Sequence, residues 1–164
     1  ILPIFSSCAV YLMSVTSVRS FLSAHAADLQ IIELDVSTAT VELAAQGHGV
    51  EPGQIAKTLA LRIGDEIVLV VTNGTARLDN KKFKARFACK PRMLGLDEVE
   101  AETSHPVGGV CPFGLPKPMK VYCDLSLQAY DEVVPAAGGT HAAVRISPGR
   151  LASLTDAEWV DVCQ

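Results

Sequence analysis

The chain has 164 residues, 49% of them hydrophobic, which is enough for one globular domain but not for a second full core. Intrinsic disorder is excluded, because a disordered chain combines low hydrophobicity with high net charge, and here the net charge is only −4. The same acidic balance excludes a protein that binds nucleic acid strongly and nonspecifically, since such proteins are basic.

The cysteines and histidines are scattered along the chain, with no CxxC pair and no histidine spacing typical of a zinc site. A metal site would have to be assembled from distant segments. We therefore expect free thiols in a reducing compartment, the cytoplasm, and neither a metal ion nor a cofactor. The cysteines are Cys8, Cys89, Cys111, Cys123 and Cys163.

The first methionine is Met13, and an amphipathic helical pattern follows it over residues 14–26. We expect residues 1–12 to be an upstream extension outside the fold and residues 13–164 to form the domain. Ala24-His25-Ala26 also resembles a signal-peptide cleavage site, but no positive charge precedes the apolar run. No later segment approaches the roughly 18 apolar residues of a membrane span, so no membrane partner is expected.

Between residues 30 and 72 the pattern predicts a strand, a helix and a hairpin. The strand covers residues 30–36, and the helix is capped by Ser37 or Thr38 and ended by Gly47 and Gly49. Residues 57–63 then alternate, and Gly64-Asp65 connects them to the β-branched run 66–72. We expect this second strand of the hairpin to be buried on both faces.

Helix caps and turn residues predict the remaining elements. After an Asn73-Gly74 turn and a short strand through Leu78, Asp79 caps a basic helix that Pro91 ends. Asp97 and Glu100 resemble a capping box, and Ser147-Pro148 begins a last helix that reaches about Leu154. Short strands are expected at residues 92–94, 120–125, 132–136 and 142–146. This order predicts a single α/β domain with a central mixed, strongly bent, barrel-like sheet flanked by helices.

Lys57 stands where a loop enters the first strand of the hairpin. A cation there is costly to desolvate unless it reaches water or meets an anion. A bound anionic ligand would explain the position of Lys57. The alternative is a lysine at the edge of a strand that points into water.

The loop over residues 103–118 is rich in glycine and proline. Its glycines let the backbone approach a ligand closely, and its prolines fix its shape. Such a loop can present N–H groups to an oxyanion or a carbonyl, which is where acyl-transfer sites gain much of their rate. A compact surface loop without chemistry is the alternative. The residues are Gly108, Gly109 and Gly114, with Pro106, Pro112 and Pro116.

Cys111 follows His105 by six residues in the same loop, which raises the hypothesis of a thiol hydrolase. An activated thiol needs a base oriented by a third group and a lowered pKa, and the sequence supplies neither. GxSxG, P-loop and GxGxxG patterns are absent, so common hydrolase and nucleotide-binding motifs do not apply.

Positive charge is concentrated in residues 77–92, which carry a net charge of +6 while the remainder of the chain carries −10. Such a run is often a solvated helix face. The alternative is a patch for a polyanion, because a stripe of Lys and Arg matches a phosphate backbone. The candidate RNA-binding residues are Arg77, Lys81, Lys82, Lys84 and Arg86.

Three segments taken together resemble the YbaK/ProX family of aminoacyl-tRNA deacylases, over about residues 36–150. They are Gln54-Ile-Ala-Lys57-Thr-Leu, the valine-rich strand with its Asn73-Gly74 turn, and Gly108-Gly-Val-Cys-Pro112-Phe-Gly114. Asp124 and Ala137-Gly138 are also similar. The loop reads Gly-Val-Cys-Pro where the best-known cysteinyl-tRNA branch has Gly-Cys-Ser-Pro, so that branch's substrate is not carried over.

The resemblance implies a free-standing editing enzyme that hydrolyses the ester between a wrong amino acid and the 3′-terminal adenosine of a tRNA, usually tRNA for proline. A small acyl group is expected (Ala, Ser, Cys or Thr), because binding alone separates small side chains poorly. A prolyl-tRNA synthetase is a candidate partner. The alternative function is a non-catalytic module that binds tRNA or a synthetase.

The resemblance also implies roles for individual residues. Lys57 would hold the terminal phosphate or ribose of the substrate, and loop N–H groups would bind the ester carbonyl. The expected catalytic residues are Lys57, Gly108, Gly109, Val110, Cys111 and Pro112. The residues expected to line the substrate pocket are Thr103, His105, Phe113, Gly114 and Asp124.

Overall fold

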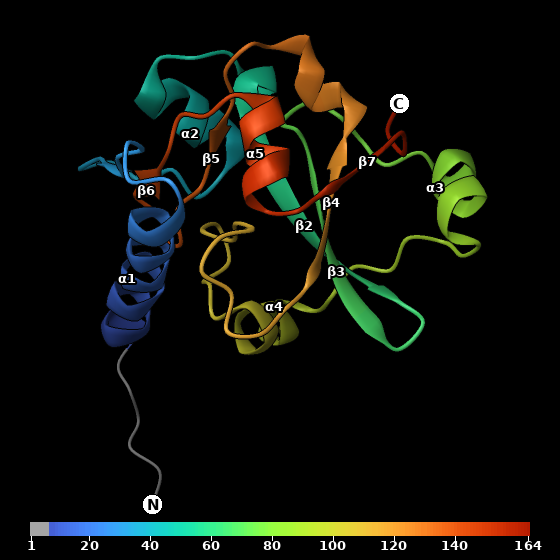
Figure 1. The fold of residues 1–164 in the computed structure, drawn as a ribbon, viewed down its shortest axis with the longest axis horizontal. Helices are drawn as coiled ribbons and strands as arrows, with labels where there is room; N and C mark the ends of the chain where they lie inside the picture. Colours follow the sequence, from blue (N-terminus) through green and yellow to red (C-terminus); the bar gives the residue numbers. More distant parts are fainter. Residues whose placement is uncertain (1–6) are drawn as a thin grey trace, which may run out of the picture.

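The computed structural model describes the backbone of residues 7–164 and the side chains of residues 14–164 (Figure 1). Its helices are α1 (Ser7–His25), α2 (Val41–His48), α3 (Asn80–Phe87), α4 (Leu96–Thr103) and α5 (Pro148–Leu154), with 3-10 turns η1 (Pro52–Gln54) and η2 (Leu125–Ala129). Its strands are β1 (Ile32–Glu33), β2 (Ile55–Ile63), β3 (Glu66–Asn73), β4 (Lys120–Asp124), β5 (Val134–Pro135), β6 (Ala142–Ala143) and β7 (Glu158–Val160). Helix α1 begins within the predicted upstream extension, whose residues 1–6 lie outside the described residues.

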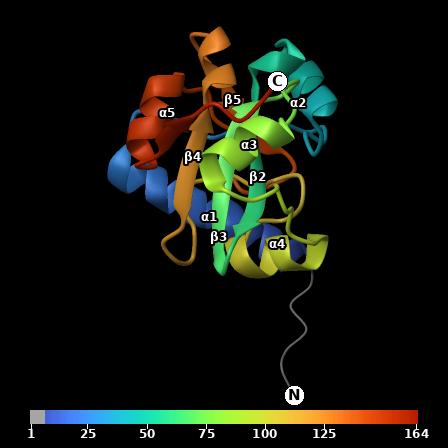
Figure 2. The same ribbon diagram turned by 90° about the vertical axis from the view of Figure 1, so that its right-hand side faces the viewer.

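The main sheet has the strand order β5-β2-β3-β4-β7 and is mixed. Strands β2 and β3 form an antiparallel hairpin, whereas β5, β4 and β7 join in parallel. The short antiparallel pair β1–β6 is a separate sheet, which an isolated bridge between Ala136 and Ala143 connects to the end of β5. The long hairpin curves across the molecule, and helices lie around the sheet (Figures 1 and 2). The predicted single α/β domain with a mixed, bent sheet is therefore confirmed.

Strand β3 separates two hydrophobic cores, because successive side chains of a strand point to opposite faces. Leu69 and Val71 join the larger core, to which α1 and α5 contribute. Val68 and Val70 join a second core around Phe83 of α3. Figure 2 views the molecule from the side of α3, with α1 on the far side of the sheet. The prediction that this strand is buried on both faces is confirmed.

Several local predictions agree with the structure. The hairpin turns at Gly64-Asp65, with Ile63 paired to Glu66. Asp79 caps α3, accepting a hydrogen bond of 3.0 Å from the Lys82 N–H. Ser147 caps α5, accepting one from the Arg150 N–H. None of the helices in the described part of the chain is long and apolar enough to cross a membrane.

Other predictions were wrong, and most of the errors concern caps and strand lengths. Thr40, not Ser37 or Thr38, caps α2. The Asp97–Glu100 capping box does not form, because α4 already begins at Leu96 after Gly95, without a side-chain cap. Helix α3 ends before Pro91, with Ala88 in the left-handed conformation.

Several of the expected strands are shorter than predicted or reduce to isolated bridges. The strands expected at 30–36, 132–136 and 142–146 shrink to β1, β5 and β6. Those expected through Leu78 and at 92–94 reduce to single bridges, Leu78 to Cys163 and Met93 to Leu61. The edge strand β7 was not predicted.

Candidate active site

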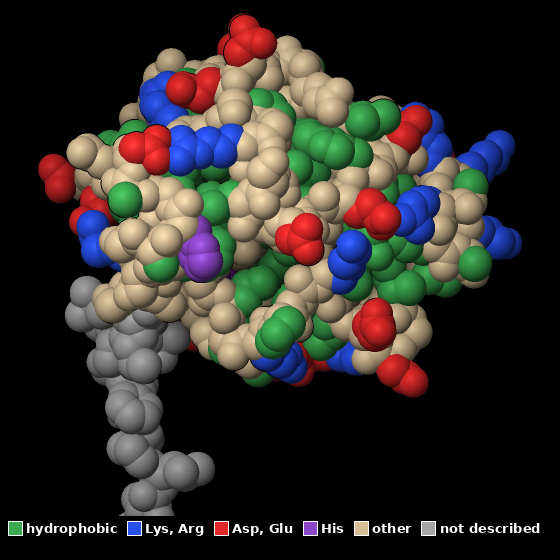
Figure 3. All heavy atoms as spheres, in the orientation of Figure 1, with side chains coloured by type: hydrophobic (Ala, Val, Ile, Leu, Met, Phe, Trp, Pro, Cys, Tyr) green, Lys and Arg blue, Asp and Glu red, His purple; other side chains and the backbone are tan. Residues whose placement is uncertain are grey.

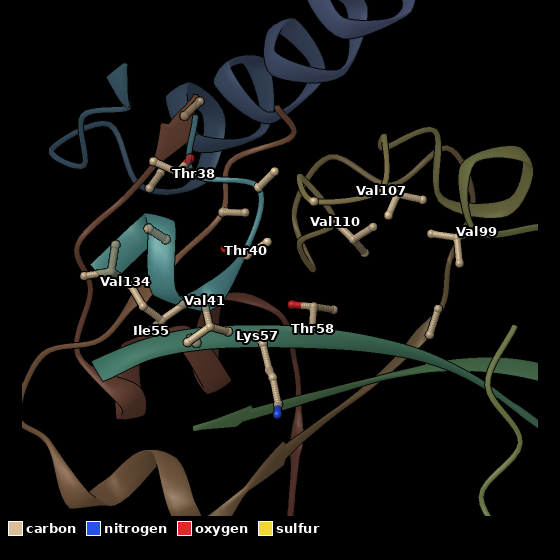
Figure 4. A pocket seen from close by; sticks show the side chains of 18 of the residues that line it. Thr38, Thr40, Val41, Ile55, Lys57, Thr58, Val99, Val107, Val110 and Val134 are labelled. Carbon is tan, nitrogen blue, oxygen red and sulfur yellow. The ribbon is translucent and has the colours of Figure 1, made fainter. Parts of the chain in front are cut away.

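A cavity of about 270 Å³ lies between the start of α2, one face of β2 and the glycine-rich loop (Figure 4). Its wall is mostly aliphatic, and none of the described residues that line it is acidic. The lining residues are Thr38, Ala39, Thr40, Val41, Ala44, Ile55, Ala56, Lys57, Thr58, Ala60, Met93, Leu94, Leu96, Val99, Val107, Gly108, Val110, Val134, Ala136, Ala142 and Ala143.

The alternation of β2 decides which of its side chains face this cavity. Ala56 and Ala60 pack in the larger core, on the cavity side, and Leu59 packs in the second core on the opposite side. Thr58 therefore shares the face of the two alanines, and Lys57 shares the face of Leu59. Figure 4 shows this arrangement, with Thr58 turned toward Val110 and Lys57 leaving β2 on the other side.

Lys57 is half-buried, and its Nζ donates a hydrogen bond of 2.6 Å to the carbonyl oxygen of Ala76. Burial is the main cause that lowers the pKa of this ammonium group, and the nearby charge of Arg77 acts in the same direction. Lys57 belongs to the cavity wall, but its cationic end lies beyond the edge of that wall. The hydrogen-bond acceptor for the Lys57 ammonium group in this structure is thus a main-chain carbonyl.

The glycine-rich loop reaches the cavity through Val107, Gly108 and Val110. Gly108 has a φ of +88°, and a Cβ there would lie 2.9 Å from the Ala39 carbonyl oxygen. A Cβ at Gly109 would lie 2.8 Å from the backbone of Gly139. These glycines therefore let the loop pack directly against two other backbone segments.

The N–H groups of this loop differ in their availability. The Gly109 N–H donates to the Pro106 carbonyl at 2.9 Å, so it is already engaged. The N–H groups of Gly108 and Val110 donate to no other group in the part of the chain that the structure describes. Among the described residues, two main-chain donors thus remain free on residues that line the cavity, Gly108 and Val110.

Cys111 and His105 lie behind the loop rather than in the cavity, and both are fully buried. The His105 Nε2 is 2.8 Å from the Phe113 carbonyl, and Nδ1 bonds the hydroxyl of Ser14 in α1. A carbonyl only accepts, so Nε2 carries the proton and Nδ1 accepts from Ser14. Burial lowers the pKa of His105, which keeps the imidazole neutral. His105 therefore ties the loop to α1.

The geometry around Cys111 argues against a thiol hydrolase. Its Sγ lies 3.6 Å from the His105 Nε2, but that nitrogen already donates to Phe113. Burial raises the pKa of the Cys111 thiol to about 12. A buried thiol that keeps its proton is inert as a nucleophile.

None of the residues expected to line the substrate pocket lines this cavity. Thr103 and His105 are fully buried, and the Thr103 hydroxyl donates to the Val99 carbonyl at 2.6 Å. Phe113 lies in the larger core, where it stacks on Phe21. A Cβ at Gly114 would lie 2.7 Å from the backbone of Ser17. In this structure these residues pack within the loop and against α1, outside the cavity.

Asp124 and Pro112 also lie away from the cavity. Asp124 is 1% exposed, and its carboxylate accepts hydrogen bonds from the Ser126 and Val162 N–H groups. It therefore joins the end of β4 to the C-terminal segment. Pro112 is buried and absent from the cavity wall.

The basic residues of α3, together with Arg77 before it, divide into two groups. Lys82 contacts Asp161 at 3.0 Å, and Arg86 contacts Glu158 at 2.6 Å, so both tie α3 to the β7 segment. Arg77, Lys81 and Lys84 form no ion pair within the described residues. Figure 3 shows Lys and Arg side chains projecting at the edge where α3 lies. The free positive charge is thus smaller than the sequence suggested.

Sequence reasoning missed the cavity face of β2 and the segment before α2. Thr38, Thr40 and Val41 line the cavity, as does Thr58. One signal was available: every second residue of β2 from Ala56 to Ala60 is small, and small side chains leave room for a cavity. The described residues contain no group of three or more His, Cys, Asp or Glu side chains that could hold a metal ion.

Comparisons with known proteins show which family this chain resembles. The family model of the aminoacyl-tRNA editing domain matches residues 35–154. Protein YwhH of Bacillus subtilis is 41% identical over 154 residues, which cover 93% of this chain and 98% of YwhH. The candidate Cys-tRNA(Pro)/Cys-tRNA(Cys) deacylase EbsC of Enterococcus faecalis is 32% identical over 126 residues, which cover 75% of this chain and 76% of EbsC.

A solved structure of a similar protein has the same fold. The crystal structure of a candidate trans-editing enzyme for prolyl-tRNA synthetase superposes with a TM-score of 0.85 and 34% identity, covering 92% of this chain and 97% of the other. The resemblance found in the sequence is therefore confirmed, as is the expectation of an enzyme from a deacylase family. The chain belongs to the family of aminoacyl-tRNA editing domains.

Proposed function

We propose that this protein is a free-standing editing factor that hydrolyses the ester bond of a mischarged aminoacyl-tRNA. Its substrate carries a small acyl group (Ala, Ser, Cys or Thr) on tRNA for proline. The observation that carries the proposal is a small aliphatic cavity with free N–H donors on Gly108 and Val110. The names of EbsC and of the superposed trans-editing enzyme support the assignment to tRNA for proline.

The chemistry requires no nucleophile from the protein. An aminoacyl ester is already activated, so a water oxygen can attack its carbonyl carbon once the two are positioned. The oxyanion that forms would accept hydrogen bonds from the Gly108 and Val110 N–H groups. Collapse then expels the ribose oxygen, which takes a proton from the attacking water. Free amino acid and tRNA are the products.

Lys57 would bind the terminal phosphate or ribose of the tRNA. Its ammonium group lies on the face of β2 opposite the cavity, next to the charge of Arg77. A phosphate oxygen is a stronger acceptor for a cation than the Ala76 carbonyl that Lys57 now contacts. On this proposal the flexible Lys57 side chain exchanges one acceptor for the other when the tRNA binds.

The unpaired cations near α3 would contact the tRNA backbone. Within the described part of the chain, Arg77, Lys81 and Lys84 have no acidic partner, whereas Lys82 and Arg86 do. Replacing both Lys81 and Lys84 by Ala should raise KM and flatten the dependence of KM on salt concentration. A matched double variant of Lys82 and Arg86 should leave that dependence nearly unchanged. Equal effects of the two double variants would contradict this division.

The proposed reaction is tested with Ala-, Ser-, Cys- and Thr-charged tRNA for proline, with correctly charged prolyl-tRNA as the negative control. Release of free amino acid from at least one mischarged member, but not from prolyl-tRNA, supports editing. Binding of the same tRNAs without release would favour the non-catalytic module instead. A prolyl-tRNA synthetase is the expected partner in the cytoplasm. Adding it to the same assay tests whether it changes the release of free amino acid.

A further inference from the structure

One polar side chain in the cavity wall is left without a partner. The polar residues of the wall are Thr38, Thr40, Lys57 and Thr58. The Thr38 hydroxyl donates to the Thr140 carbonyl at 3.0 Å, and the Thr40 hydroxyl accepts from the Leu43 N–H. Lys57 is bonded to Ala76. Among the described residues the Thr58 Oγ1 is buried and has no hydrogen-bond partner.

This hydroxyl lies on the cavity side of β2. Its neighbours on that face are Ala56 and Ala60, and Val110 of the glycine-rich loop lies across from it (Figure 4). The side chains of these three residues offer no hydrogen bond. Burying a hydroxyl without a partner costs free energy, and a ligand that supplies the partner recovers that cost.

We infer that Thr58 is a specificity-determining residue, whose hydroxyl bonds a hydroxyl group on the acyl side chain of the substrate. The inference rests on the proposed function and narrows its substrate range. Seryl and threonyl esters should be preferred over alanyl esters. A thiol is a weaker hydrogen-bonding group, so cysteinyl esters gain less from this contact.

The charge of the cavity decides which substrate group Thr58 contacts. Every aminoacyl ester also carries an α-ammonium group, but the wall holds no Asp or Glu that could pair with it. A cation buried in an aliphatic cavity without an anion is strongly disfavoured. The ammonium group therefore stays at the mouth of the cavity, and the side chain of the amino acid enters.

The test compares kcat/KM for Ser-, Thr- and Ala-charged tRNA for proline in the wild type and in Thr58→Val, which keeps the shape of the side chain and removes the hydroxyl. We expect Thr58→Val to lose about 10- to 100-fold on the seryl and threonyl esters and little on the alanyl ester. Thr58→Ser keeps the hydroxyl and should keep the preference.

Thr72→Val is the matched control, because Thr72 is a buried strand residue outside the cavity wall whose hydroxyl donates to the Asn73 carbonyl. It should not change the preference. Thermal unfolding of each variant verifies that it is folded.

The outcomes separate this inference from the proposed function. Equal loss on all esters in Thr58→Val would show a contact to a group common to all of them, and no loss would show no contact; either result overturns the inference while the deacylase proposal stands. Absence of release by the wild type from every ester would overturn both.

Discussion

Removing the Ser14 hydroxyl should loosen the loop that carries the proposed donors. In Ser14→Ala the Nδ1 of His105 loses its donor while remaining fully buried. Leaving a buried acceptor unsatisfied costs about 1–3 kcal/mol in the free energy of unfolding. For a chain of this size that corresponds to about 2–4 °C in Tm for each kcal/mol. Urea and thermal unfolding measure the loss.

Ser20→Ala is the matched control, because Ser20 is an exposed serine in the same helix. A surface substitution of this kind changes stability by about 0.5 kcal/mol or less. If Ser14→Ala unfolds at the same urea concentration as Ser20→Ala, the tie between His105 and α1 does not hold the loop. A selective fall in kcat of folded Ser14→Ala would show that the tie also positions the donors.

Three further predictions follow from the site. Burial lowers the pKa of His105 below its ordinary value of 6.5, so the unfolded chain binds more protons than the folded protein. The contribution of His105 to the free energy of unfolding is therefore complete above about pH 6.5 and falls as the pH drops below it. His105→Gln should flatten this pH dependence in urea titrations. Lys57→Ala should lower kcat/KM by about 10²–10³, and Lys57→Arg should recover part of it. Iodoacetamide should label half-buried Cys89 rather than Cys111 and leave deacylation intact; inactivation by Cys111→Ala in a folded protein would restore the thiol mechanism.

Local chemistry made part of the fold predictable. The β2–β3 hairpin follows from alternation, a tight turn and a β-branched run, all of which lie within twenty residues. The caps at Asp79 and Ser147 need only the residues that follow them. In contrast, β5 and β6 extend over two residues each, and their positions depend on partners far along the chain. Strand β7 likewise pairs with β4, which lies more than thirty residues before it in the sequence.

The site was harder to predict than the fold, because each face of a strand is defined by what covers it. The sequence places Lys57 and Leu59 on one face of β2 and Thr58 on the other. It does not say that α3 covers the first face and that the loop leaves a cavity over the second. The buried position of Cys111 likewise depends on α1, which lies far from it in the sequence.

The loop connects the fold to the proposed chemistry through its rigidity. Donors stabilise an oxyanion best when their positions are fixed before the reaction, because no free energy is then lost in orienting them. Gly109 packs on the backbone of Gly139, and His105 ties the loop to α1. These contacts lie outside the cavity, yet they set the positions of the Gly108 and Val110 N–H groups. Residues that never touch the substrate should therefore influence kcat through the geometry of this loop.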